Sequence, residues 1–225
     1  MIKFRNVTKR YGDVNAVDKI DLHILPKEFV SIVGQSGTGK TTLVKLLTAE
    51  ERVSNGRIII GDWDITGIRR SEVPYLRRQI GTIFQDFKLF PKKTLFENVA
   101  FALHVCGVPR RKINSLVPKI LDIVGLKDKM GRYPYQISGG EAQRVAIARA
   151  MVHKPKILIA DEPTGNLDSI NTKDIIDLLK RINEFGTTVL LVTHDKDVVN
   201  SLKKRVITLE GGKIVNDQQR GRYRL

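Results

Sequence analysis

The chain has 225 residues, enough to bury a substantial core as one large or two small domains. Charged residues at 28% and hydrophobic residues at 41% exclude an intrinsically disordered protein. The single cysteine, Cys106, excludes an internal disulfide and suits a reducing compartment. No signal-peptide core is evident, and the most apolar stretch, residues 99–108, is about half of the roughly 20 residues that a membrane span requires. We therefore expect no membrane crossing.

The net charge of +15 is compatible with three classes of partner: nucleic acid, an anionic membrane surface or an acidic protein. The basic residues form short scattered clusters, and no aromatic residues are interleaved with them as a base-stacking surface requires. We expect a solvated surface or one apposed to an anionic membrane, and no specific nucleic-acid partner. The charge alone does not identify a substrate.

Alternating apolar residues predict strands at residues 2–7 and 20–24, with a turn at Gly12 and Asp13 between them. Tyr11 precedes this turn. An aromatic side chain in this position suits stacking on an adenine, but a single tyrosine at the end of a strand also suits ordinary packing. The local sequence leaves both roles open.

A short apolar run at residues 29–33 predicts a buried parallel strand, and residues 42–49 predict a helix. The glycine-rich segment between them has the strand–loop–helix context of a phosphate-binding loop. Glycines allow backbone N–H groups to converge on phosphate oxygens, and the helix N-terminus adds its positive dipole end. Lys40 supplies charge for the β and γ phosphates, and the Thr41 hydroxyl suits Mg²⁺. The expected nucleotide-binding residues of this segment are Gly34, Gln35, Ser36, Gly37, Thr38, Gly39, Lys40, Thr41 and Thr42.

The next segment combines strands with a short helix. Turn residues bound a predicted strand at residues 56–61, and a short helix is predicted at 72–79 after a basic loop. A strand at 80–84 stops at Gln85, whose side chain suits contact with a metal, although one glutamine at a strand end has little specificity by itself.

Between residues 94 and 126 the apolar residues recur with helical spacing. Pro109 suits the start of a second helix, and Gly125 suits its end. Helices within a block that strands flank predict a helical insertion in a parallel α/β core.

Ser138, Gly139 and Gly140 precede a helix predicted at residues 141–153. We expect the free backbone donors of its first turn to form a second anion site. This turn has no evident role in holding the nucleotide or the metal of its own subunit, and that mismatch leads us to expect a dimer.

The apolar run at residues 157–160 predicts a buried strand that brings Asp161 and Glu162 to its carboxyl end, where ligands bind in open α/β sheets. Asp161 is placed to hold Mg²⁺, and Glu162 to polarise an attacking water. A strand at 188–192 likewise leads to His194, which suits contact with a γ-phosphate.

The rest of the C-terminal region contains an amphipathic helix predicted at residues 170–185 and a closing hairpin of strands at 205–209 and 213–215. The remaining histidines are interpreted as surface or packing residues: His23, His104 and His153.

These elements together resemble the ATP-binding-cassette (ABC) ATPases over essentially the whole chain. The resemblance implies an α/β fold of the P-loop NTPase class, with a RecA-like parallel core, an N-terminal antiparallel β subdomain and an inserted helical subdomain. Residues 1–225 then form a single domain. The core and β subdomain occupy about 1–85 and 156–225, and the helical subdomain with the signature motif occupies about 86–155.

The resemblance also implies residue roles. Glu162 corresponds to the catalytic base and His194 to the switch histidine, and both act with Lys40 in ATP hydrolysis. Ile137 stands where the signature usually has leucine, a mild departure. The implied Mg²⁺ ligands are Thr41, Gln85 and Asp161. The implied ATP contacts outside the phosphate loop are Tyr11, Gln85, Ser138, Gly139, Gly140 and Asp168.

In such a family, two subunits pack head to tail with ATP between them. The signature turn of each subunit, here residues 138–140, then caps the γ-phosphate that the other subunit's phosphate loop binds. ATP stabilises the closed homodimer through its higher affinity for that state. Asp168 is expected at the same interface.

A narrower resemblance lies within the family. Residues 161–168 are similar to the cell-division, lipoprotein-releasing and macrolide-exporting branches, while residues 73–81, 84–89 and 217–223 look most like the cell-division branch. This implies a bacterial protein at the cytoplasmic face of the cell membrane, paired with an integral membrane protein and controlling cell-wall hydrolysis.

Two alternatives remain open. One is the ATPase subunit of a lipoprotein-releasing or macrolide-exporting transporter, which shares every catalytic residue with the cell-division branch. The other is a nucleic-acid-acting member of the superfamily, which the short separation between Lys40 and Asp161 disfavours because it leaves no room for long coiled coils. The identity of a membrane partner distinguishes the first alternative from a cell-division protein.

Overall fold

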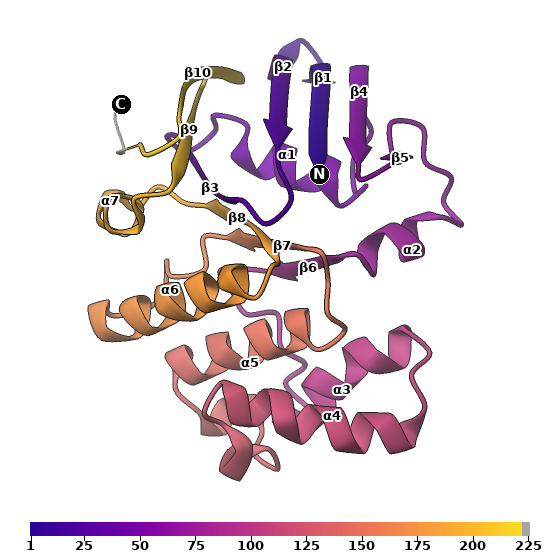
Figure 1. The fold of residues 1–225 in the computed structure, drawn as a ribbon, viewed down its shortest axis with the longest axis vertical. Helices are drawn as coiled ribbons and strands as arrows, with labels where there is room; N and C mark the ends of the chain where they lie inside the picture. The colour runs from indigo at the N-terminus through magenta and orange to yellow at the C-terminus, as the bar shows by residue number, and fades with distance from the viewer. Residues whose placement is uncertain (222–225) are drawn as a thin grey trace.

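In the computed structural model, which describes residues 1–221, two sheets and their helices are stacked in layers (Figure 1). An antiparallel sheet lies at one end, a mainly parallel sheet crosses the middle, and helices from the middle of the chain form the other end. Arg222 and Tyr223, which belong to the C-terminal segment used for the narrower resemblance, lie outside the described residues.

The N-terminal sheet is antiparallel. Its strands are β1 (Ile2–Tyr11), β2 (Val14–Ile24), β4 (Asn55–Ile60) and β5 (Trp63–Asp64), in the order β2-β1-β4-β5. Ile2, Phe4 and Ile58 are buried because alternate side chains of a strand point to the same face. They share a core with Leu43 and Leu46 of helix α1 (Lys40–Leu47), which contacts both sheets.

The second sheet carries the candidate site. Its strands are β3 (Phe29–Val33), β6 (Ile80–Ile83), β7 (Ile157–Asp161), β8 (Thr188–Val192), β9 (Arg205–Glu210) and β10 (Lys213–Gln218). They lie in the order β10-β9-β3-β8-β7-β6, parallel except for β10, which runs antiparallel to β9. Every residue of β3 and β8 is buried, as expected for central strands that are covered on both faces.

Three helices follow one another between β6 and β7: α3 (Leu95–Val105), α4 (Arg110–Ile123) and α5 (Gly139–Met151). Two single 3₁₀ turns, Lys127–Lys129 and Pro134–Gln136, join α4 to α5. α5 belongs to two cores, because Val145 and Ala148 pack with α3 and α4 while Ile147 packs under the mixed sheet. The predicted subdomain boundaries at about 86 and 155 stay a prediction.

Three helices complete the described chain: α2 (Val73–Arg77), α6 (Ser169–Glu184) and α7 (Lys196–Leu202). The apolar face of α6, which includes Ile175 and Leu179, packs in the same core as β7 and β8. α7 was not predicted. Its seven residues are too few for a clear apolar period, and its start is fixed by the Asp195 carboxylate, which accepts from the amides of Asp197 and Val198.

Most predicted strands and helices are found within a few residues of their expected positions, but the first two strands were predicted too short: β1 continues to Tyr11 and β2 begins at Val14 instead of residue 20. The strand predictions for residues 29–33 and 188–192 match β3 and β8. The predicted closing hairpin is confirmed, since β9 and β10 pair antiparallel. The sequence pattern did not predict that β9 also pairs in parallel with β3, which makes the hairpin part of the mixed sheet. Strand β5, with two residues, was not predicted.

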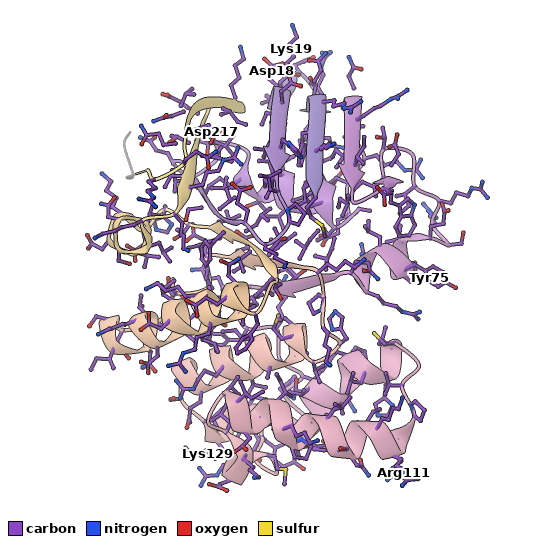
Figure 2. The ribbon with its side chains drawn as sticks, viewed as in Figure 1. Asp18, Lys19, Tyr75, Arg111, Lys129 and Asp217 are labelled. Carbon is purple, nitrogen blue, oxygen red and sulfur yellow. The ribbon has the colours of Figure 1, made fainter. Side chains whose placement is uncertain are left out.

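Basic side chains are spread over the molecule. Figure 2 places Lys19 at one end of the long axis, beyond the antiparallel sheet, and Arg111 and Lys129 at the other end, among the helices. Basic residues therefore occur at both ends of the molecule. Within residues 1–221, no helix combines the length and the apolar character that crossing a bilayer requires.

A network of ion pairs around the buried Arg205 links the C-terminal hairpin to the remainder of the fold. Arg205 on β9 makes two parallel bonds of 2.7 Å to the carboxylate of Asp217 on β10. Its Nη1 also donates to Glu28 Oε1 and to the backbone oxygen of His23, both at 2.9 Å. These carboxylates raise the pKa of Arg205, against the effect of burial. The guanidinium thus makes four hydrogen bonds, although the residue is only 8% exposed.

We expect Arg205→Leu to lower the free energy of unfolding by about 3 kcal/mol, because it leaves the Glu28 carboxylate, whose side chain is only 15% exposed, without its partner and also removes the paired bonds to Asp217. Urea denaturation measures the change. Lys180→Leu is the matched control, since it removes the cation of the exposed pair with Asp177 and should change stability by less than about 0.5 kcal/mol. Equal losses in the two variants would contradict the prediction.

Candidate active site

The carboxyl ends of four parallel strands meet at one edge of the mixed sheet and open into a cleft of about 570 Å³. Parallel strands share one direction, so residues that follow them in the sequence are brought together there. The cleft is lined by Ala16, Gln35, Ser36, Gly37, Gly39, Lys40, Thr41, Thr42, Gln85, Asp161, Glu162 and His194. The structure therefore assembles the predicted phosphate loop, acid pair, glutamine and histidine around one space.

The loop between β3 and α1 holds its lysine by its own backbone. Lys40 is 8% exposed, and its Nζ donates to the carbonyl oxygens of Gly34 at 2.6 Å and Gln35 at 2.8 Å. Burial lowers the pKa of Lys40, while the nearby charges of Glu162 and Asp161 raise it in part. An ammonium group is thus held at the start of α1, where free backbone donors favour an anion.

Gly39 precedes α1 in the left-handed conformation, with φ of +101°, and its position is tightly confined. A Cβ added there would lie 2.2 Å from the carbonyl oxygen of Ala16 on β2. Glycine is required both for the backbone conformation and for this close approach. This contact connects the antiparallel sheet to the cleft, and it explains why Ala16 is among the lining residues.

Asp161 ends β7 in a partly buried position. Burial, followed by the neighbouring Glu162 charge, raises the pKa of Asp161, against the opposing effects of Lys40 and Lys88. An added cation would relieve this unfavourable burial of negative charge. The oxygen donors Thr41, Gln85 and Asp161 all line the cleft and fit Mg²⁺, which commonly uses one or two carboxylates together with phosphate oxygens. Residues 1–221 contain no cluster of three His, Cys, Asp or Glu side chains that could hold a metal ion by themselves.

Glu162 is held at three points by the last residue of β8 and the two residues that follow it. Its amide donates to the Val192 carbonyl at 2.8 Å, and its Oε2 accepts from Thr193 Oγ1 at 3.0 Å. Its Oε1 lies 2.7 Å from His194 Nδ1. Glu162 also has φ of +47°, a left-handed conformation that is unfavourable for a residue with a side chain. Such strain persists only where the surroundings fix the residue, and it is concentrated at functional sites.

Gln85 follows β6 and is joined to the loop after Glu162. Its Nε2 donates to Asn166 Oδ1 at 3.4 Å, and Asn166 Nδ2 donates back to the Gln85 carbonyl at 3.2 Å. Gly165 lies against the same side chain, since a Cβ at Gly165 would be 2.8 Å from Gln85 Nε2. The glutamine side chain is therefore positioned by residues that stand far from it in the sequence.

Tyr11 does not line the cleft. The residue is 41% exposed, and Lys9 Nζ lies 4.8 Å from the centroid of its ring. Its predicted contact with adenine stays a prediction.

The Ser-Gly-Gly turn also lies outside the cleft of its own subunit. The expectation of entirely free donors there was wrong in part, because Ser138 Oγ accepts from the Glu141 amide at 3.3 Å and the Glu141 carboxylate accepts from the Ser138 amide at 3.1 Å. This capping box satisfies one amide of the first turn of α5. Asp168 similarly caps α6 by accepting from the Asn171 amide at 2.9 Å. Both residues thus have a role within the subunit.

Three residues at the site were not predicted from the sequence: Ala16, Thr193 and Asn166. Thr193 stands directly before His194, and a hydroxyl at the end of a buried strand is a signal that would have identified it. Ala16 and Asn166 carry no such signal, because their positions depend on contacts between distant segments.

The comparisons with known proteins agree with this geometry. A family model described as "ABC transporter" matches residues 17–165, so the chain belongs to the ABC transporter family, and it is an ATP-hydrolysing ABC-type ATPase. The cell division ATP-binding protein FtsE of Bacillus subtilis is 49% identical over 99% of this chain and 98% of its own length. FtsE of Streptococcus pneumoniae is 46% identical over 99% and 97%.

A solved structure shares the fold. It is a dimeric post-hydrolysis state of the ATP-binding cassette MJ0796 bound to ADP and Pi, with a TM-score of 0.89 and 34% identity over 99% of this chain and all of that one. The α/β fold predicted from the sequence is thereby confirmed.

Gly39→Ala is expected to destabilise the protein by roughly 3 kcal/mol or more, because the new methyl group meets the Ala16 carbonyl at 2.2 Å and also strains the backbone. Gly37→Ala is the matched control, with φ of +81° but no atom within 4 Å of the added Cβ, and it should lose only about 1–2 kcal/mol. Denaturant unfolding without nucleotide compares the two. An equal loss would show that the contact with Ala16 contributes nothing.

Proposed function

We propose that this protein is an ATPase subunit that dimerises on ATP and passes a conformational change to the integral membrane protein FtsX, and so controls cell-wall hydrolysis during cell division. The observation that carries the proposal is the division of the site: one cleft gathers Lys40, Asp161, Glu162 and His194, while the Ser-Gly-Gly turn of the same subunit lies outside it. The similarity to FtsE over the whole chain supports the cell-division role.

ATP binds in the cleft with its phosphates on the loop and Lys40. Thr41, Asp161 and Gln85 would hold Mg²⁺, which would supply positive charge to the phosphates. Glu162 orients and polarises the attacking water, and its fixed carboxylate lies beside the phosphate loop at the same edge of the sheet. His194 contacts the γ-phosphate when it turns from Glu162, and its side chain is 66% exposed, so that movement is open to it.

A second copy of the chain completes each site. The signature turn, Ser138, Gly139 and Gly140, contacts the γ-phosphate that is bound by the other subunit. The Asp168 loop is expected at the same interface, because its Leu167 side chain lies close to the turn: a Cβ added at Gly139 would be 3.7 Å from Leu167 Cδ2. ATP bridges the two copies, and hydrolysis removes the bridge.

A mainly apolar groove of about 550 Å³ suits the membrane partner. It lies between the mixed sheet and the helices and is lined by Phe84, Phe90, Phe101 and Val105, among others. Phe101 and Val105 are 42% and 53% exposed, which is unusual for apolar side chains grouped in one place. Phe84 directly precedes Gln85, so a segment of FtsX in this groove would contact the loop that enters the nucleotide cleft.

The helix that carries the signature turn is joined to the same loop. Arg149 near the end of α5 donates to the carbonyl oxygens of Lys88 at 2.6 Å and Phe87 at 2.8 Å. Near the other end of α5, Gln143 Nε2 donates to the Pro163 carbonyl at 2.6 Å. A change at the γ-phosphate is therefore transmitted along α5 to the groove, and from there to FtsX.

The protein is placed at the cytoplasmic face of the bacterial membrane by FtsX. The net charge of +15 adds attraction to anionic lipid as a weaker, salt-dependent contribution.

Glu162→Gln is expected to lower turnover by about a hundredfold or more and to accumulate as an ATP-bound dimer, because the base is lost while the nucleotide contacts remain. Size-exclusion chromatography with light scattering, with and without Mg·ATP, measures the mass. Glu162→Gln that stays monomeric with bound ATP would contradict the dimer.

Mixing Ser138→Arg with Lys40→Ala protein, each inactive alone, checks that the sites are shared between subunits. One of the two pockets in the mixed dimer combines an intact phosphate loop from one subunit with an intact signature turn from the other, so turnover should be recovered there.

Phe101→Asp is expected to reduce capture of FtsX from detergent-solubilised membranes roughly tenfold or more, because it places a charge in the apolar groove. Phe185→Asp is the matched control: Phe185 is 92% exposed, lies just after α6 and is outside the groove. Flotation with protein-free neutral and anionic vesicles measures binding of the protein to lipid alone, and so distinguishes it from capture of FtsX. A captured partner with a solute pathway would instead identify a lipoprotein-releasing or macrolide-exporting transporter.

A further inference from the structure

We propose that Thr193 is a positioning residue for ATP hydrolysis: its hydroxyl fixes the carboxylate of Glu162 in the orientation that the attacking water requires. This inference rests on the proposed role of Glu162 as the base. It assigns a second function to the segment after β8, in addition to that of His194.

The hydrogen bonds around the Thr193 hydroxyl leave its proton one acceptor. Thr193 Oγ1 accepts from the Asp195 amide at 3.1 Å, and it lies 3.0 Å from Glu162 Oε2. A hydroxyl has one proton to donate, and an ionised carboxylate only accepts. The Thr193 proton is therefore directed at Glu162 Oε2, in a charge-assisted bond that is stronger than one between neutral groups.

The backbone around this hydroxyl is rigid. Thr193 is fully buried, and its amide donates to the Ile32 carbonyl of the central strand β3 at 3.1 Å. On the other side, the Asp195 carboxylate caps α7. Thr193 is thus fixed by both the sheet and a helix, and it transfers that rigidity to the Glu162 carboxylate.

The two side chains that hold Glu162 differ in their freedom to move. His194 holds Oε1, but its side chain is 66% exposed, whereas Thr193 holds Oε2 from a position with no exposure. When His194 turns to the γ-phosphate, Thr193 is the remaining side-chain support of the carboxylate. A base displaced by about 1 Å loses on the order of a hundredfold in rate, so this support acts on the chemical step.

Steady-state ATP hydrolysis by the full-length chain tests the proposal. Thr193→Val, which replaces the hydroxyl with a methyl group, should lower kcat about ten- to a hundredfold and change KM for ATP less than about twofold. Thr193→Ser keeps the hydroxyl and should retain kcat within about threefold. Thr193→Ala also removes the hydroxyl but places no group where it was. This variant replaces Thr193→Val in the kinetic test if the valine variant loses nucleotide binding or fails to fold.

A double variant separates positioning from a structural role. In a Glu162→Gln background, the carboxylate is already lost, so Thr193→Val should reduce the residual turnover by less than about twofold. A loss of the same size in both backgrounds would overturn the proposal, as would wild-type kcat in Thr193→Val or an equally large loss in Thr193→Ser. Wild-type turnover of Glu162→Gln alone would instead refute the role of Glu162 as the base.

Discussion

Opposite charges are buried together at the carboxyl edge of the mixed sheet, and the arrangement of the cleft follows from holding them there. Lys40 is 8% exposed and lies beside Asp161 and Glu162. Burial lowers the pKa of Lys40 and raises the pKa of Asp161, so it favours the neutral form of each side chain. Each charge is tolerable because the other sign is near and because backbone carbonyls accept from the lysine. The cleft is therefore suited to a ligand that carries negative phosphates together with a divalent cation.

Holding these groups in place requires unfavourable backbone geometry. Gly39 approaches the Ala16 carbonyl too closely for any side chain, and Glu162 has a left-handed conformation although it is not glycine. Hydrogen bonds between Glu162 and residues 192–194 stabilise the left-handed conformation of Glu162. The function of the site thus depends on the rigidity of β3, β7 and β8, whose residues are nearly all buried.

Helix α5, which begins at the Ser-Gly-Gly turn, contacts a loop near each of its two ends. Through Gln143 it touches the loop after Glu162, and through Arg149 it touches the loop after Gln85. It also shares apolar residues with the cores of both the sheet and the helical layer. A single rigid element therefore joins the nucleotide cleft, the turn expected at a second subunit and the groove suited to a membrane partner.

Local patterns that physical chemistry restricts tightly predict the α/β fold, the apolar strands of its core and the phosphate loop. They also put Gln85, Asp161, Glu162 and His194 at strand ends, which share one edge in a parallel sheet. Which side chains hold these four residues in place could be read only from the folded protein. Thr193, Asn166 and Ala16 act through contacts between segments far apart in the chain, and Tyr11 and Ser138 lie outside the cleft for the same reason. Local sequence specifies elements, whereas packing alone specifies the distances between them.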